Sequence, residues 1–230
     1  MQIAGLQKLT LLDFPGTVAC IVFTPGCNLR CPFCHNSSLV FSTAGERIPQ
    51  DEVLSFLKRR RGLLDGVVVT GGEPLLQPDI ASFLTSVKEL GYKVKLDTNG
   101  TRPELLKRLV AGKLVDRVAM DIKSSPENYP FAVGVSGLDI TGIEESKDFL
   151  LGGGIDYEFR TTVVKGIHTD ADFESIAKWI DGASEYYLQQ FKDSGELIDP
   201  AGLSQFTPDE LSRFADIVRP FVRSVEIRGI

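Results

Sequence analysis

The chain reads VACIVFTPGCNLRCPFCHN over residues 18–36, an apolar run followed by a loop that carries three cysteines. The run predicts a buried β-strand, and Pro25-Gly26 predicts the turn that ends it. Cys27, Cys31 and Cys34 then follow within eight residues. Thiols at this spacing in a chain without a disulfide framework indicate a soft metal ion or an iron–sulfur cluster.

The number of cysteines leaves two interpretations open. A closed zinc site, or a cluster held entirely by protein, needs four ligands, whereas the loop supplies three thiols. Either Cys20 or His35 completes the set, or one metal position stays open. Cys20 lies inside the predicted strand, where a buried hydrophobic role is typical. A module with structural zinc on Cys20, Cys27, Cys31 and Cys34 is the alternative from a different class of protein, and it lacks the usual second C-x2-C pair.

Length and composition place the chain among soluble globular proteins. It has 230 residues, 43% of them hydrophobic and 24% charged, which predicts a single domain over residues 1–230. The net charge of −6 argues against a nucleic-acid-binding protein. No signal peptide and no membrane-spanning run is evident, so we expect a cytoplasmic protein that binds no membrane.

Strand and helix patterns alternate about six times along the chain, which predicts parallel strands joined by helical crossovers. The expected fold is an open, partial (β/α)6 barrel, with a flat doubly wound sheet as the alternative. Residues 1–16 are expected to add an N-terminal strand, residues 37–47 to be irregular, and residues 207–230 to form a last helix and strand. Strands are predicted at 17–23, 66–70, 92–96, 115–122, 157–164 and 185–191. Helices are predicted at 49–61, 78–91, 141–151 and 172–180, between a start signal at 101–104 and Gly112, and between a start signal at 207–210 and Pro220.

Polar motifs follow the predicted strands where each one ends. In parallel α/β proteins the carboxyl ends of the strands carry the functional residues. The motifs are Gly71-Gly72-Glu73-Pro74, Asp97-Thr98-Asn99-Gly100 and Asp121-Ile122-Lys123, with Arg160 inside the fifth strand and Gln190 near the end of the sixth. Taken alone, each has an ordinary structural interpretation as a glycine turn, an Asn-Gly turn or a surface ion pair. Arg160 either faces the interior of the barrel or pairs with an acid such as Glu158.

The cysteine loop resembles the cluster motif of radical S-adenosylmethionine (SAM) enzymes, with Phe33 as the aromatic residue of C-x3-C-x-aromatic-C. The surrounding segments 11–16, 24–28 and 34–36 resemble the activating proteins of anaerobic ribonucleoside-triphosphate reductase. This resemblance implies a [4Fe-4S] cluster on Cys27, Cys31 and Cys34, whose fourth iron binds SAM. It implies a glycyl-radical enzyme as partner, and the reductase in particular. A flavodoxin or ferredoxin would donate the electron, because no second set of cysteines is present for an auxiliary cluster.

The same resemblance implies roles for residues at the strand ends. Cofactor contacts are expected from Phe33, His35, Gly71, Gly72, Glu73, Asp121, Lys123, Arg160 and Gln190. Gly72 would offer its backbone to the SAM amino group, with Glu73 behind it, and Lys123 would support the SAM carboxylate. Asp97, Thr98 and Asp121 resemble a site for a monovalent cation near SAM.

Two other activities within the same class stay open at this point. One is a small-molecule radical SAM enzyme resembling 7-carboxy-7-deazaguanine synthase, and the other is an activase of the pyruvate formate-lyase type. His168, in the segment Gly166-Ile167-His168-Thr169, receives no role from the sequence.

Overall fold

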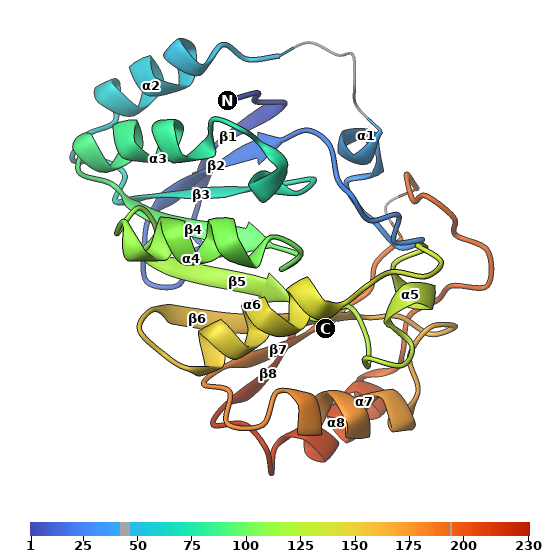
Figure 1. Cartoon of the computed structure of the whole chain (residues 1–230). Helices are drawn as coiled ribbons and strands as arrows, with labels where there is room; N and C mark the ends of the chain where they lie inside the picture. Colours follow the sequence, from blue (N-terminus) through green and yellow to red (C-terminus); the bar gives the residue numbers. More distant parts are fainter. Residues whose placement is uncertain (42–46, 194) are drawn as a thin grey trace. The chain divides into compact units, whose positions relative to one another are not determined.

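The structure is a computed structural model that describes residues 1–41, 47–193 and 195–230. Its strands follow one another in the sheet in chain order, from β1 to β8, so β1 and β8 are the edge strands. The predicted α/β class with an open sheet is confirmed (Figure 1). The doubly wound alternative is wrong, because such a sheet reverses its strand order at a switch point. Within the described residues, no helix is long and apolar enough to cross a membrane.

The chain divides into two compact units. The first comprises Met1–Asn28, Ser38–Thr98 and Arg102–Ala119, and the second comprises Leu29–Ser37, Asn99–Thr101 and Met120–Ile230. Strand β5 (Arg117–Asp121) contributes its first three residues to the first unit and its last two to the second.

In the first unit, β1 (Gly5–Thr10) pairs antiparallel with β2 (Ala19–Thr24). Parallel pairing joins β2 to β3 (Gly66–Gly71) and β3 to β4 (Lys93–Thr98), in registers that set Thr24 opposite Gly71 and Val69 opposite Leu96. The carboxyl ends of these strands therefore share one edge. The three valines of β3, Val67, Val68 and Val69, are fully buried, as a strand covered on both faces requires.

The longer helices of this unit lie where the sequence predicts helices. They are α2 (Gln50–Arg59), α3 (Ile80–Glu89) and α4 (Pro103–Ala111). Helix α3 buries Ile80, Phe83, Leu84 and Val87, which recur at helical spacing. A short 3-10 turn, η1 (Pro74–Leu76), follows β3. Residues 37–47 were expected to be irregular. This expectation is wrong for the short helix α1 (Ser37–Val40). Residues 42–46 lie outside the described part of the chain.

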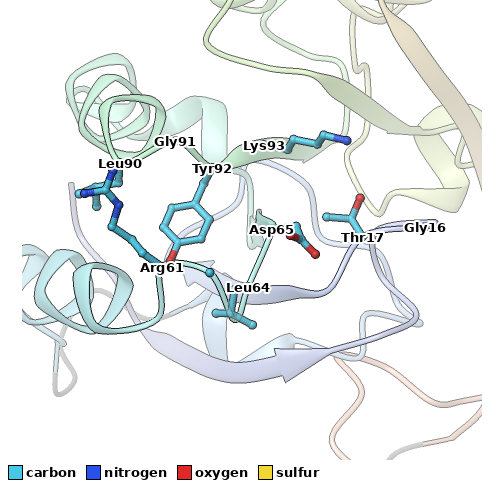
Figure 2. A pocket seen from close by; sticks show the side chains of 10 residues that line it. Gly16, Thr17, Arg61, Leu64, Asp65, Leu90, Gly91, Tyr92 and Lys93 are labelled. Atoms are coloured by element: carbon cyan, nitrogen blue, oxygen red, sulfur yellow. The ribbon is translucent and has the colours of Figure 1, made fainter.

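A cavity of about 480 Å³ opens beside the amino ends of β3 and β4 in this unit (Figure 2). Its lining includes Arg61, Asp65 and Lys93, and the Tyr92 hydroxyl donates to the Leu57 carbonyl at 2.7 Å. None of the predicted site residues lines it. The cavity therefore lies at the amino ends of these strands, whereas the motifs of this unit follow their carboxyl ends.

In the second unit, β6 (Asp156–Val163), β7 (Tyr186–Gln190) and β8 (Val225–Arg228) are parallel, and Val163 lies opposite Gln190. The helices are α5 (Tyr129–Ala132), α6 (Thr141–Leu151), α7 (Asp170–Trp179) and α8 (Pro208–Val218). Helices α7 and α8 lie side by side (Figure 1). They are joined by the stacked rings of Phe173 and Phe214, whose centroids are 4.4 Å apart.

Candidate active site

The loop after β3 crosses directly over the start of the cysteine loop. The Glu73 N–H donates to the Gly26 carbonyl at 2.7 Å, and the Gly72 N–H donates to the Thr24 carbonyl at 2.9 Å. A Cβ atom at Gly72 would lie 2.0 Å from the Gly26 oxygen. Gly71 has φ +125°, and a Cβ there would lie 2.4 Å from the Thr24 backbone. The glycine pair thus allows two backbones to touch, which is the close approach that glycine permits.

Glu73 ties the ends of two neighbouring strands together. Its side chain is buried, and its Oε1 accepts from the Leu75 N–H at 3.0 Å and from the Thr98 hydroxyl at 2.8 Å. The nearby Gln77 amide donates to the Pro25 carbonyl at 2.8 Å. These contacts fix the segment after β3 against the residues that precede Cys27.

A buried ion pair lies near the end of β4. The Lys95 ammonium is 2.8 Å from Asp97 Oδ1, and only 1% of the lysine side chain is exposed. Beyond the strand, the Asn99 Oδ1 accepts from the Thr101 N–H at 3.1 Å and from its hydroxyl at 2.7 Å. Gly100 has φ +78°. This segment therefore makes the turn that an Asn-Gly pair favours.

In the second unit, Asp121 lies between two cations. Its Oδ2 is 2.8 Å from the Lys123 ammonium, and its Oδ1 is 3.0 Å from the Arg160 guanidinium. Burial raises the pKa of Asp121, but Arg160 and Lys123 outweigh that effect and bring the pKa to about 2. Arg160 thus pairs with Asp121, whereas the buried Glu158 lies 3.6 Å from Arg228. The sequence had named Glu158 as a possible acid partner of Arg160, whereas the acid found beside it is Asp121.

Tyr129 and His168 hydrogen-bond to the backbone of Asp121 and Lys123. The Lys123 N–H donates to the Tyr129 hydroxyl at 3.2 Å, and that hydroxyl donates to the Asp121 carbonyl at 3.3 Å. His168 Nδ1 accepts from the Val164 N–H at 3.0 Å, so Nε2 carries the proton and donates to the Lys123 carbonyl at 2.9 Å. Burial lowers the pKa of His168, which favours this neutral form. Both rings position Lys123, and the sequence assigned neither of them a role.

The four cysteines are reduced thiols in different surroundings. Cys20 is fully buried in β2, and burial raises its pKa to about 12. Cys27 belongs to the first unit and is half-buried. In the second unit, the Cys34 N–H donates to the Cys31 carbonyl at 3.0 Å, which closes a tight turn. Burial lowers the pKa of Lys123, but the nearby Asp121 and Cys31 raise it above its ordinary value.

The second half of the cysteine loop is anchored by two segments of its own unit. The Arg30 N–H donates to the Val133 carbonyl at 2.9 Å, and the Asp199 N–H donates to the Pro32 carbonyl at 3.0 Å. Phe33 is buried. The His35 ring lies against Phe191, with centroids 5.8 Å apart. Partial desolvation and the Lys123 ammonium lower the pKa of His35.

Gln190 ends β7 with its two amide atoms in different situations. The Nε2 donates to the Phe206 carbonyl at 2.6 Å. The Oε1 is buried, and the described residues place no hydrogen-bond donor on it. The side chain can therefore accept one further hydrogen bond, for example from a hydroxyl group.

Comparison with known proteins decides the family. The sequence model of the Radical SAM superfamily matches residues 21–180. The chain belongs to this superfamily. It is 32% identical, over 99% of its length and 96% of the relative, to the "Putative glycyl-radical enzyme activating enzyme" of Methanocaldococcus jannaschii. It is also 34% identical to the pyruvate formate-lyase-activating enzyme of Clostridium pasteurianum, over 53% of this chain and 52% of that one.

A solved structure supports the fold of this radical SAM protein. Streptococcus suis SuiB bound to S-adenosylmethionine has a TM-score of 0.67 and 15% identity, covering 91% of this chain and 52% of SuiB. The superfamily match and the two relatives identify the chain as an enzyme of the glycyl-radical activating family.

The residues of this radical SAM enzyme fit a cluster with one open iron. Three thiols lie within eight residues of one loop, which is the number of protein ligands that leaves one iron of a four-iron cluster open. The fourth thiol, Cys20, is buried in β2, and its raised pKa keeps it protonated. Because the thiolate is the form that binds metal, Cys20 is a poor ligand. Thiolates are the ligands that iron–sulfur clusters take.

Proposed function

We propose that this chain binds a [4Fe-4S] cluster through Cys27, Cys31 and Cys34, binds SAM at the fourth iron, and installs a glycyl radical on a partner enzyme. The observation that carries the proposal is the division of the thiols, since three lie on one loop while Cys20 is sealed in a strand. When bound and reduced, the cluster supplies the electron that cleaves SAM to methionine and a deoxyadenosyl radical.

The side chains at the strand ends are proposed to bind and orient SAM. Asp121 holds Lys123 and Arg160 as a preformed cationic pair, and either cation suits the SAM carboxylate. Around the amino group we place the Gly71-Gly72 backbone, with the buried Glu73 fixing the turn behind it. Gln190 Oε1 can accept from a ribose hydroxyl.

The aromatic residues of the cysteine loop have a different proposed task. Phe33 and His35 lie beside the thiols in the sequence, and the His35 ring packs on Phe191. We propose that they limit the access of water and oxygen to the cluster and flank the bound SAM. The lowered pKa of His35 keeps the ring neutral, which is appropriate beside the cationic sulfonium of SAM.

Anaerobic ribonucleoside-triphosphate reductase is the proposed partner. The support is the resemblance of segments 11–16, 24–28 and 34–36 to its activating proteins, together with the similarity to the M. jannaschii relative over nearly its full length. The chain has four cysteines and no set for an auxiliary cluster, so a flavodoxin or ferredoxin is the proposed electron donor. An anaerobic cytoplasm is the proposed location.

Anaerobic mixing with purified glycyl-radical enzymes tests this function. The reconstituted protein, SAM and a reductant should produce the electron spin resonance doublet of a glycyl radical on the reductase. A reductase whose radical glycine is replaced by alanine is the control and should give no signal. A signal on pyruvate formate-lyase and none on the reductase would show that the proposed partner is wrong and that pyruvate formate-lyase is the substrate. SAM cleavage that yields no radical on either enzyme would contradict activation and favour a small-molecule substrate.

A further inference from the structure

Lys95 is a charged residue that lies almost completely buried in the first unit. Residues two apart on a strand point to the same face, so Lys95 and Asp97 of β4 lie on one face. Their charged atoms are 2.8 Å apart, and the side chains are 1% and 12% exposed. A lysine is almost never fully buried unless it is paired. The lysine is therefore built into β4 as the counter-ion of this aspartate.

The three residues expected to bind a monovalent cation do not fit one in this chain. Asp97 already faces the Lys95 ammonium. The Thr98 hydroxyl donates to Glu73, which orients its proton toward the carboxylate. Asp121 forms ion pairs with both Lys123 and Arg160. A potassium or sodium ion binds oxygen atoms whose charge is uncompensated, and here each carboxylate is neutralised inside its own unit.

We propose that Lys95 takes the place of the monovalent cation, so that this enzyme binds and cleaves SAM without potassium or sodium. The ammonium supplies the positive charge that compensates the Asp97 carboxylate and holds it in place at the end of β4. Lys95 is thus a positioning residue. The part of the proposal that concerns SAM rests on the proposed function, whereas the part that concerns cation binding by the protein does not.

Removal of the Lys95 ammonium should make the protein respond to soluble cations. Lys95→Met keeps a side chain of similar length and removes the ammonium that lies 2.8 Å from the largely buried Asp97 carboxylate. Removal of one partner of a buried ion pair is costly. A soluble cation should then bind beside Asp97 and stabilise the fold. The double variant Lys95→Met/Asp97→Asn removes both charges and should be indifferent to cations.

The test compares these variants in chloride salts of potassium, sodium and choline at a fixed ionic strength of about 0.15 M. For the reconstituted wild type, we expect the thermal midpoint and the SAM dissociation constant to be the same in all three salts. For Lys95→Met, potassium or sodium at roughly 100 times its Kd should raise the midpoint by about 5–10 °C. SAM affinity should rise with it, by roughly tenfold. Lys93→Met, an exposed lysine on the same strand, is the matched control and should behave as wild type.

Two results would overturn the proposal. One is a wild-type protein that needs potassium or sodium to bind SAM. The other is a folded Lys95→Met protein that is indifferent to both ions. If Lys95→Met does not fold in any salt, the wild-type titration and the double variant decide. If the wild type binds no SAM in any salt, the proposed function fails, and the midpoints still test Lys95.

Discussion

One methyl group at Gly72 should separate the loop after β3 from the cysteine loop. In Gly72→Ala the new Cβ would lie 2.0 Å from the Gly26 oxygen, where ordinary contacts begin near 3.4 Å, so the backbones must part by more than 1 Å. That movement breaks the Glu73–Gly26 hydrogen bond of 2.7 Å and weakens the Gly72–Thr24 bond. We expect the free energy of unfolding to fall by about 2–4 kcal/mol. Since Gly26 precedes Cys27, SAM cleavage should fall by roughly 100-fold.

Two assays on the reconstituted protein measure this prediction. Denaturant titration reports the free energy of unfolding, and chromatography of 5′-deoxyadenosine after addition of dithionite reports SAM cleavage. The matched control is Gly152→Ala at the end of α6, where the added Cβ meets only ordinary contacts at 3.4 Å. A Gly72→Ala protein with wild-type stability and activity would refute the argument that close backbone contact requires this glycine.

The remaining predictions concern the second unit and Cys20. Asp121→Asn should lower the free energy of unfolding by roughly 2 kcal/mol at neutral pH, because the pKa of this three-quarters buried carboxylate is depressed to about 2. The stability that the ionised Asp121 contributes is present above the ordinary pKa of 3.8 and is lost as the pH falls toward 2. A pH series of denaturant titrations measures this loss. Replacement of the exposed Asp216 by asparagine is the control. His168→Ala leaves the Val164 N–H and the Lys123 carbonyl unpaired and should cost about 2–4 kcal/mol while weakening SAM binding, measured by calorimetry. An unchanged SAM affinity in His168→Ala would show that His168 does not position Lys123 for SAM binding. Cys20→Ala should keep full SAM cleavage and lose about 1 kcal/mol of stability through a small cavity.

The regular elements were predictable where their period was long enough to read. The run 141–151, which three glycines follow, predicted α6 with the observed bounds. The start signal at 207–210 and the apolar spacing up to Val218 predicted α8. Helices of four residues, such as α1 and α5, were missed, because one turn contains too few residues to show a period of 3.6.

The site was predictable in its motifs and less so in its contacts. Cysteine spacing and the strand-end motifs need only local sequence. The supporting contacts join residues far apart: Gln77 reaches Pro25 across 52 positions, and His168 reaches Lys123 across 45. No local pattern encodes such pairs. Lys95 is the nearest to an exception, since a lysine in an apolar strand two residues before Asp97 is a signal of a buried ion pair.

The most direct test of the account is anaerobic reconstitution of the wild type and of four single cysteine-to-alanine variants. Iron, sulfide and 5′-deoxyadenosine are measured for each protein. The account predicts about four irons per wild-type chain. SAM cleavage should be lost on replacing Cys27, Cys31 or Cys34 and retained on replacing Cys20. One tightly bound zinc with no iron, or equal loss of SAM cleavage in Cys20→Ala, would contradict it.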